Sequence, residues 1–236
     1  MTKTFVYLCR PGPNEELRYS LRSVDYFYPD STVWVVGGKP KWYSGNFISV
    51  GQTGDAFRNV ALNLSKIVAS KEIPEDIIIM NDDFFFLEYL DTIPSYISGT
   101  LKDRISLHRS NGINSSYVSK LMQSYRHCKA HSREPLDFDI HVPMPVKKSN
   151  LAKIVNDPVM WRSNYGNQFA DPKTIEKICD VKVYSNSKYF FKSYDYASRQ
   201  YPLISTHDDS FEIVHDHILK DMFSKPSRYE SSSDAA

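Results

Sequence analysis

The sequence predicts an α/β fold with a mostly parallel sheet flanked by helices. An apolar strand at residues 5–9, helical spacing at 15–28 and a second strand at 32–36 give the β-α-β order of a parallel sheet. A second amphipathic helix over about 55–70 then leads into a third apolar run at 76–80. That run is continuous rather than alternating, which is typical of an internal strand covered on both faces.

Local signals set the remaining elements. A Pro-Gly-Pro turn at residues 11–13 ends the first strand, and Asn14 is expected to cap the helix that carries Glu15 and Glu16 in its first turn. Asp55 is expected to cap the second helix. The further predictions are a short strand at 47–50, a turn and short helix within 88–99, a strand at 105–107, helices at 117–128, 147–156, near Trp161, at 171–179 and at 211–223, an extended segment at 138–144, and strands at 182–184 and 203–205.

The chain is expected to form a single domain over residues 1–223. Its nucleotide-binding half covers about 1–87, and its acceptor and catalytic half covers about 88–223. The segment 224–236 is polar and serine-rich, so it is predicted to be a disordered tail.

Composition narrows the class of protein. The 236 residues are 41% hydrophobic and 24% charged, as in an ordinary globular protein. A net charge of +1 argues against nucleic-acid binding mainly by bulk electrostatics, and the lack of clustered basic residues disfavours a metal-dependent nuclease. Cys9, Cys128 and Cys179 have no metal-type spacing, which predicts free thiols and a cytoplasmic location. No run approaches the ~18 apolar residues of a membrane span.

The sequence Asn81-Asp82-Asp83 comes directly after the third apolar strand and is the chief candidate site. Open α/β sheets bind their ligands outside the carboxyl ends of the strands. Carboxylates there can hold Mg²⁺ or Mn²⁺ against the phosphates of a substrate. The alternative is that Asp82 and Asp83 only end the strand and cap the next element of the chain. No Gly-x-Gly-x-x-Gly sequence comes after the first strand, which disfavours a dinucleotide site.

Several other polar residues are candidates for binding or catalysis. Arg10 leaves the carboxyl end of the first strand and Arg58 lies near the start of the second helix, so either can contact a nucleotide or its phosphates. His141, on a proline-stiffened segment, is a candidate general base, and Arg162 is a candidate phosphate partner. Asp209 comes after a second strand-like run and is either another base or, with Asp208, a helix cap.

Five islands of sequence resemble the Stealth family of sugar-phosphate transferases. That family includes bacterial capsule polymerases and the lysosomal-enzyme N-acetylglucosamine-1-phosphotransferase. The run NEELRYSLRS at 14–23 resembles one of its blocks, and IIMNDDFF at 78–85 is similar to its NDD motif. Shorter likenesses are VWVVGGKPKW at 33–42, HVPMP at 141–145 and RSN at 162–164. The segment Gln52–Ile73 and the short chain depart from the family, and a compact glycosyltransferase of phage or bacterial type sharing this core would also explain the sequence.

The resemblance implies a Rossmann-like fold of the glycosyltransferase-A type, a nucleotide-diphosphate sugar donor and a divalent metal. It favours Asp82, Asp83, His141 and Arg162 as site residues. Our hypothesis is a metal-dependent glycosyltransferase with a uridine donor. Asp83, supported by Asp82, would hold Mg²⁺ or Mn²⁺, while Arg10, Arg58, Asn81 and Asp82 would bind the donor. The acceptor is a glycan, a protein or a modified DNA base.

Two alternatives accompany this hypothesis. Attack at phosphorus rather than at the anomeric carbon would make the protein a Stealth-type hexose-1-phosphate transferase, and a pairing of His141 with Arg162 suits that reaction. The short chain and the departure at Gln52–Ile73 favour glycosyl transfer instead. The other alternative is a non-catalytic domain that binds a sugar nucleotide or a glycan.

Overall fold

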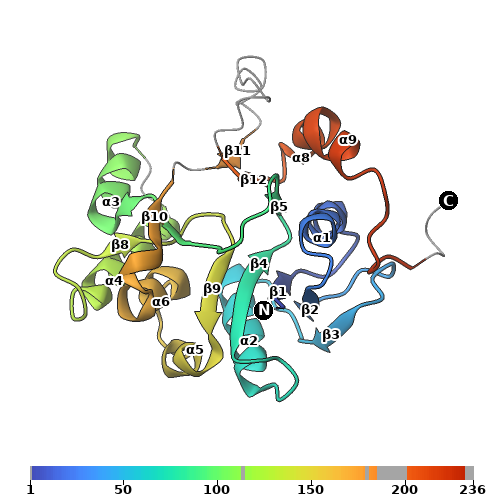
Figure 1. Ribbon diagram of the computed structural model, residues 1–236. Helices are drawn as coiled ribbons and strands as arrows, with labels where there is room; N and C mark the ends of the chain where they lie inside the picture. The colour runs from blue at the N-terminus through green and yellow to red at the C-terminus, as the bar shows by residue number, and fades with distance from the viewer. Residues whose placement is uncertain (1, 113–114, 179–180, 185–200, 232–236) are drawn as a thin grey trace.

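The computed structural model describes residues 2–112, 115–178, 181–184 and 201–231. Its centre is a five-stranded sheet in the order β3-β2-β1-β4-β9 (Figure 1). The first four of these strands are parallel, and β9 runs antiparallel to β4. The predicted fold class, a mostly parallel α/β sheet flanked by helices, is confirmed. The sheet strands are β1 (Thr4–Cys9), β2 (Thr32–Gly37), β3 (Asn46–Ser49), β4 (Asp76–Asn81) and β9 (Met144–Lys147).

Alternation along the strands gives each face of the sheet its own core. On β1, Phe5, Tyr7 and Cys9 pack toward helix α1 (Glu15–Phe27), while Val6 and Leu8 pack toward helix α2 (Ala56–Ala69). Strand β4 divides in the same way, since its isoleucines and its methionine alternate between these two cores. The prediction that β4 is covered on both faces is therefore confirmed.

The second half of the chain adds smaller layers around this sheet. Helices α3, α4 and α6 gather on the β9 side of the sheet, and α8 and α9 lie above α1 (Figure 1). Strand β12 pairs antiparallel with β5, which comes directly after the turn that ends β4. The elements are β5 (Phe84–Phe86), β6 (Ser95–Ile97), β7 (Gly99–Thr100), α3 (Leu101–Ser110), α4 (Ser116–Cys128), β8 (Leu136–Asp137), α5 (Lys148–Ile154), α6 (Trp161–Phe169), a 3₁₀ turn (Pro172–Thr174), β10 (Ile175–Lys177), β11 (Lys182–Val183), β12 (Leu203–Thr206), α8 (Phe211–Val214), a π-helical turn (His215–Leu219) and α9 (Lys220–Met222).

Three predicted elements are wrong. The strand expected at 105–107 lies inside α3, where the Thr100 side chain caps the helix by accepting from the backbone N–H of Asp103 at 3.0 Å. The short helix expected within 88–99 is replaced by β6. The helix expected at 171–179 is only a 3₁₀ turn, because the next three residues form β10 and pair with β6.

Among the described residues, no helix is both long and apolar enough to cross a membrane. Cys9 and Cys128 are free, as expected, and both are buried, while Cys179 lies outside the described residues.

The C-terminal segment is not a disordered tail over its first eight residues, 224–231. Glu230 forms a β-bridge with Tyr43, and its side chain is 4% exposed. Its carboxylate accepts from Arg22 Nη2 at 2.8 Å and from Arg18 Nη1 at 2.9 Å. The Tyr229 ring stacks on that of Tyr43. The composition of the segment predicted disorder, but these contacts hold it against α1 and the β2–β3 loop. Residues 232–236 lie outside the described part of the chain.

The ion pairs of Glu230 give a first test of the fold. Burial raises the pKa of Glu230, but Arg22, the Ser227 N–H and Arg18 together lower it to about 2. Glu230→Gln is therefore expected to lower the free energy of unfolding by about 3 kcal/mol at pH 7, because two guanidinium groups lose their partner. This stabilisation is present above the unfolded pKa of ~4.3 and is lost as the pH falls toward 2.

Urea unfolding at pH 7 measures the change, with Glu15→Gln as the matched control. Glu15 pairs with the same Arg18 at 3.0 Å, but its side chain is 53% exposed. An exposed pair of this kind contributes at most ~1 kcal/mol. Equal unfolding midpoints for the two variants would contradict the structural role given to Glu230.

Candidate functional site

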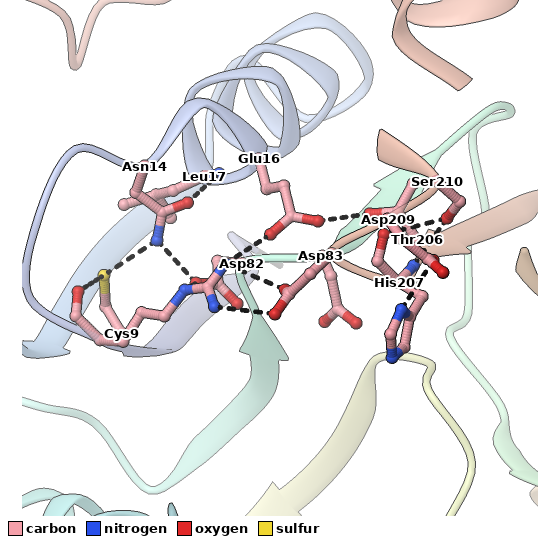
Figure 2. A network of polar contacts seen from close by, with 12 residues as sticks. Cys9, Asn14, Glu16, Leu17, Asp82, Asp83, Thr206, His207, Asp209 and Ser210 are labelled. Atoms are coloured by element: carbon pink, nitrogen blue, oxygen red, sulfur yellow. Dashed lines mark hydrogen bonds and ion pairs between the residues drawn. The ribbon is translucent and has the colours of Figure 1, made fainter. Parts of the chain in front are cut away.

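Asp82 and Asp83 lie in the tight turn between β4 and β5, at the carboxyl end of the parallel strands. The next element is strand β5, so neither aspartate caps a helix, and a role for the two carboxylates beyond ending β4 stays a prediction. Their side chains have separate partners, with Asp82 bonded to Asn14 and Asp83 bonded to His141. In Figure 2, Asn14, Glu16 and Asp82 lie by the start of α1, and Thr206, His207, Asp209 and Ser210 lie on the far side of Asp83.

On the Asp82 side, the first strand-to-helix loop supplies the partners. Asn14 caps α1 by accepting from the Leu17 N–H at 2.9 Å, and its amide donates to Asp82 Oδ2 at 2.6 Å. Arg10 Nε lies 3.6 Å from the same oxygen, and Arg10 Nη2 lies 3.0 Å from Glu16 Oε2. The predicted cap Asn14 is therefore also a site residue, because one side chain starts the helix and holds the carboxylate.

The glycines after β2 allow this loop to lie close to the sheet. Gly37 has a φ of +122°, and a Cβ there would lie 2.2 Å from the Cys9 carbonyl oxygen. A Cβ on Gly38 would lie 2.4 Å from backbone atoms of Pro11. Only glycine fits either position, so the Gly-Gly pair fixes the path of the loop that presents Arg10.

Glu16 joins this network as a second buried carboxylate. It accepts from Thr206 Oγ1 at 2.7 Å, which links α1 to the end of β12 (Figure 2). Burial raises the pKa of Glu16 to about 7, and the charges of Asp82 and Asp83 add to the rise. Burial and the neighbouring Asp83 also raise the pKa of Asp82. Acidic groups thus crowd around Arg10, and a ligand that brings further positive charge would be favoured there.

On the Asp83 side, two cationic or proton-bearing groups converge on one oxygen. His141 Nδ1 lies 2.9 Å from Asp83 Oδ2, and Lys182 Nζ lies 3.1 Å from both of those atoms. Ser205 donates to the same oxygen at 3.3 Å. Burial acts to raise the pKa of Asp83, but His141 and Lys182 together lower it, so this carboxylate is ionised.

This geometry selects one tautomer for a neutral His141. A ring nitrogen cannot donate to Asp83 and accept from Lys182 at once. With the proton on Nδ1, both His141 and Lys182 donate to Asp83 Oδ2, and no lone pair of the imidazole faces the carboxylate. Nε2 then carries the lone pair, which is the form that a general base requires. We assign this tautomer from the hydrogen-bonding pattern.

A cleft of about 640 Å³ opens beside this centre. It lies between the start of α2, the end of β4 and the segments that precede α6. Arg162 and Asp139 line it, and each is at least nine-tenths buried. Burial lowers the pKa of Arg162 to about 10, so the guanidinium remains charged at neutral pH, and burial raises the pKa of Asp139 to about 7.

The predicted site residues fall into two groups. Arg10, Asp82 and Asp83 come together through the contacts given above. Lining the neighbouring cleft are Arg58, Asn81, His141 and Arg162.

Asp209 stands apart from both groups. Its carboxylate lies 2.7 Å from His207 Nδ1, and it is Asp208 that pairs with Arg10, at 3.2 Å. The alternative that one of these aspartates caps the final helix is wrong, since the residue at the N-cap of α8 is Ser210. A catalytic role for Asp209 stays a prediction.

Sequence reasoning missed several residues of the site. From the sequence, Glu16 is assigned only a favourable interaction with the helix dipole. Asp139 is assigned no role, although it lies two residues before His141. A carboxylate so close to a candidate histidine was a usable signal. No sequence signal pointed to Lys182, because its approach to Asp83 depends on the parallel pairing of β11 with β12.

Asp83 is the residue best suited to hold a divalent cation. Its Oδ1 is buried and has no hydrogen-bond partner, while Lys182 and His141 occupy Oδ2. Among the described residues there is no group of three or more His, Cys, Asp or Glu side chains that could hold a metal. Mg²⁺ is commonly bound by one or two carboxylates, with substrate phosphates and water completing its shell. The residues fit that kind of site, in which the phosphates of a bound substrate supply further ligands.

Comparison with solved structures identifies the fold. The chain is similar to the galactosyltransferase LgtC in complex with donor and acceptor sugar analogs, with a TM-score of 0.50 and 11% identity over 95% of this chain and 98% of that one. An active-site mutant of LgtC gives a TM-score of 0.51 with the same identity and coverage. No protein-family model matches the sequence, and no curated protein does either. The resemblance to the Stealth family is therefore not confirmed.

Proposed function

We propose that the protein is a glycosyltransferase that uses a nucleotide-diphosphate sugar, with uridine as the nucleotide, to glycosylate an acceptor hydroxyl. The observation that carries the proposal is the convergence of Arg10, Asp82, Asp83 and His141 at the carboxyl ends of β1 and β4, beside a cleft of about 640 Å³. Ligands of open α/β sheets bind at this edge. The similarity of the fold to that of LgtC supports the proposal.

In the proposed reaction, the acceptor oxygen attacks the anomeric carbon of the donor. The bond from that carbon to the diphosphate breaks, and its electron pair leaves with the nucleoside diphosphate. Nε2 of His141 takes the acceptor proton, while Asp83 holds the imidazole in the required tautomer and stabilises the imidazolium. Arg10 and Lys182 lie on either side of the two aspartates and supply positive charge near the departing phosphates.

Mg²⁺ or Mn²⁺ would be held by Asp83, with Asp82 in support, and would neutralise charge on the leaving diphosphate. Asp82 Oδ2 is already engaged by Asn14, so Asp83 Oδ1 is the oxygen we expect to bind the ion directly. Asn81 and Arg58, which line the cleft, would contact the donor.

Transfer of hexose-1-phosphate is the second candidate. It is favoured by the packing of both His141 and Arg162 around the ring of Phe84, at 5.8 Å and 5.3 Å from its centroid. A base and a guanidinium held on one ring could act together at a phosphorus atom. In that reaction the bond between the two phosphates breaks, and a nucleoside monophosphate leaves.

Product analysis tests the proposal and separates the candidates. The protein is incubated with UDP-glucose, UDP-galactose or UDP-N-acetylglucosamine, with Mg²⁺ or Mn²⁺, and the released nucleotide is identified by chromatography. Release of UDP is the expected result. Release of UMP would instead establish sugar-phosphate transfer.

The third alternative is a non-catalytic binding domain, which would bind the donor without releasing either nucleotide. A panel of glycan, peptide and hydroxymethylated-DNA acceptors is included in the assay, so that the absence of turnover is meaningful. Binding of a UDP-sugar with no product in any acceptor reaction or in water would overturn the enzymatic proposal.

A further inference from the structure

Three buried polar atoms near the cleft have no hydrogen-bond partner. They are Asp83 Oδ1, Asp139 Oδ2 and Arg162 Nη2. A buried polar group that lacks a partner destabilises the fold, and it does so more strongly when the group is charged. Two of the three residues, Asp139 and Arg162, line the cleft itself. A ligand in the cleft is the natural partner for both of these atoms.

Asp139 and Arg162 do not satisfy each other. No ion pair within 4.0 Å joins these two described side chains, although the Asp139 charge acts to raise the pKa of Arg162. Arg162 Nη1 donates to the Val142 carbonyl at 2.8 Å, and its guanidinium lies over the rings of Phe84 and Trp161. The guanidinium is therefore fixed in position, with Nη2 left for a ligand.

The two atoms have opposite hydrogen-bonding character. Arg162 Nη2 can only donate, and an ionised Asp139 Oδ2 can only accept. A phosphate suits the first but is repelled by the second. A pair of adjacent hydroxyl groups suits both, because one oxygen can accept from the guanidinium while the other hydroxyl donates to the carboxylate.

We infer that Asp139 and Arg162 together form the binding site for two adjacent ring hydroxyls of the donor sugar. The inference rests on the proposed function and names the part of the donor that this side of the cleft recognises. His141 packs on the same Phe84 ring as Arg162 and contacts Asp83, so the pair lies next to the centre assigned to the diphosphate. The sugar is joined directly to the diphosphate in the donor.

Deoxy donors test the inference directly. Among UDP-glucose, UDP-galactose and UDP-N-acetylglucosamine, the tightest binder is identified by calorimetry, and its analogues lacking single ring hydroxyls are compared with it. Loss of a hydroxyl that contacts Asp139 or Arg162 is expected to weaken binding ~10–100-fold, because a buried polar group is again left unpaired. In Asp139→Asn the discrimination at one hydroxyl should shrink to a few-fold, while affinity for UDP alone stays unchanged.

The control and a second variant keep the outcome interpretable. Asp157 also lines the cleft, but its carboxylate accepts from Asn164 at 2.8 Å, so Asp157→Asn should keep full discrimination. Arg162→Lys keeps the charge and loses the forked donors, so it should relax discrimination at a neighbouring hydroxyl.

The experiment distinguishes failure of the proposed function from failure of the inferred sugar site. If neither UDP nor any UDP-sugar binds the unsubstituted protein, the proposed function fails at its uridine donor. If UDP-sugars bind but no deoxy analogue is discriminated, or if Asp139→Asn and Arg162→Lys discriminate as the unsubstituted protein does, the sugar site is overturned and the proposed function is untouched.

Discussion

Asp83→Asn is expected to lower the turnover of a UDP-sugar by ~10²–10⁴-fold while leaving the fold intact. The Asp83 carboxylate forms an ion pair with Lys182, and it keeps the imidazole proton of His141 on Nδ1. An asparagine amide can turn its NH₂ group toward Nδ1, which would place the imidazole proton on Nε2 and remove the base. The neutral amide also binds a divalent cation more weakly than the carboxylate does.

The measurement is kcat at saturating donor, with circular dichroism to verify folding. Asp76→Asn is the matched control, since Asp76 begins the same strand at its other end, where an exposed carboxylate pairs with Lys147 at 2.6 Å. That variant should retain its activity within a factor of two. Turnover by Asp83→Asn within about threefold of the unsubstituted protein would rule out Asp83 as the organising carboxylate.

Local sequence was sufficient for the first half of the fold. For β1, α1 and β4, the local sequence shows both the element and the residues that begin or end it. Asn14, for example, caps the start of α1. The strand expected at 105–107 failed for a different reason. Ile105 and Leu107 alternate around a serine over only three residues, which is too short a window to oppose the helix that Thr100 starts.

Contacts between residues far apart in the chain determine the features that local sequence did not predict. A serine-rich composition predicted disorder at the C-terminus, yet one carboxylate, Glu230, meets two arginines about 210 residues away in the chain. Lys182 reaches Asp83 across 99 residues. The motif at Asp82 and Asp83 predicted the candidate site, but the residues that set its electrostatics come from elements whose pairing no local pattern encodes.

Ionisation of the buried Asp139 carboxyl lowers the free energy of unfolding, so this residue of the candidate site also affects the stability of the fold. Its pKa is raised to about 7 by burial and by Asp137, while Ser163 acts in the opposite direction. In the unfolded chain an aspartate titrates near 3.9. Between these values the folded protein holds a proton that the unfolded chain has released, so the free energy of unfolding falls as the pH rises from about 4 to about 7. The full penalty is present above pH 7.

Asp139→Asn is expected to stabilise the protein at pH 8, by on the order of 2–4 kcal/mol, and to have little effect near pH 4.5. The amide has the size of the neutral acid but does not ionise, so the difference between the two proteins should grow across this range. Urea unfolding at the two pH values measures it, and an equal difference at both would contradict the titration of Asp139. Most substitutions of buried residues destabilise. A variant that gains stability at pH 8 while it loses discrimination among sugar hydroxyls would show that the carboxylate serves ligand binding rather than the fold.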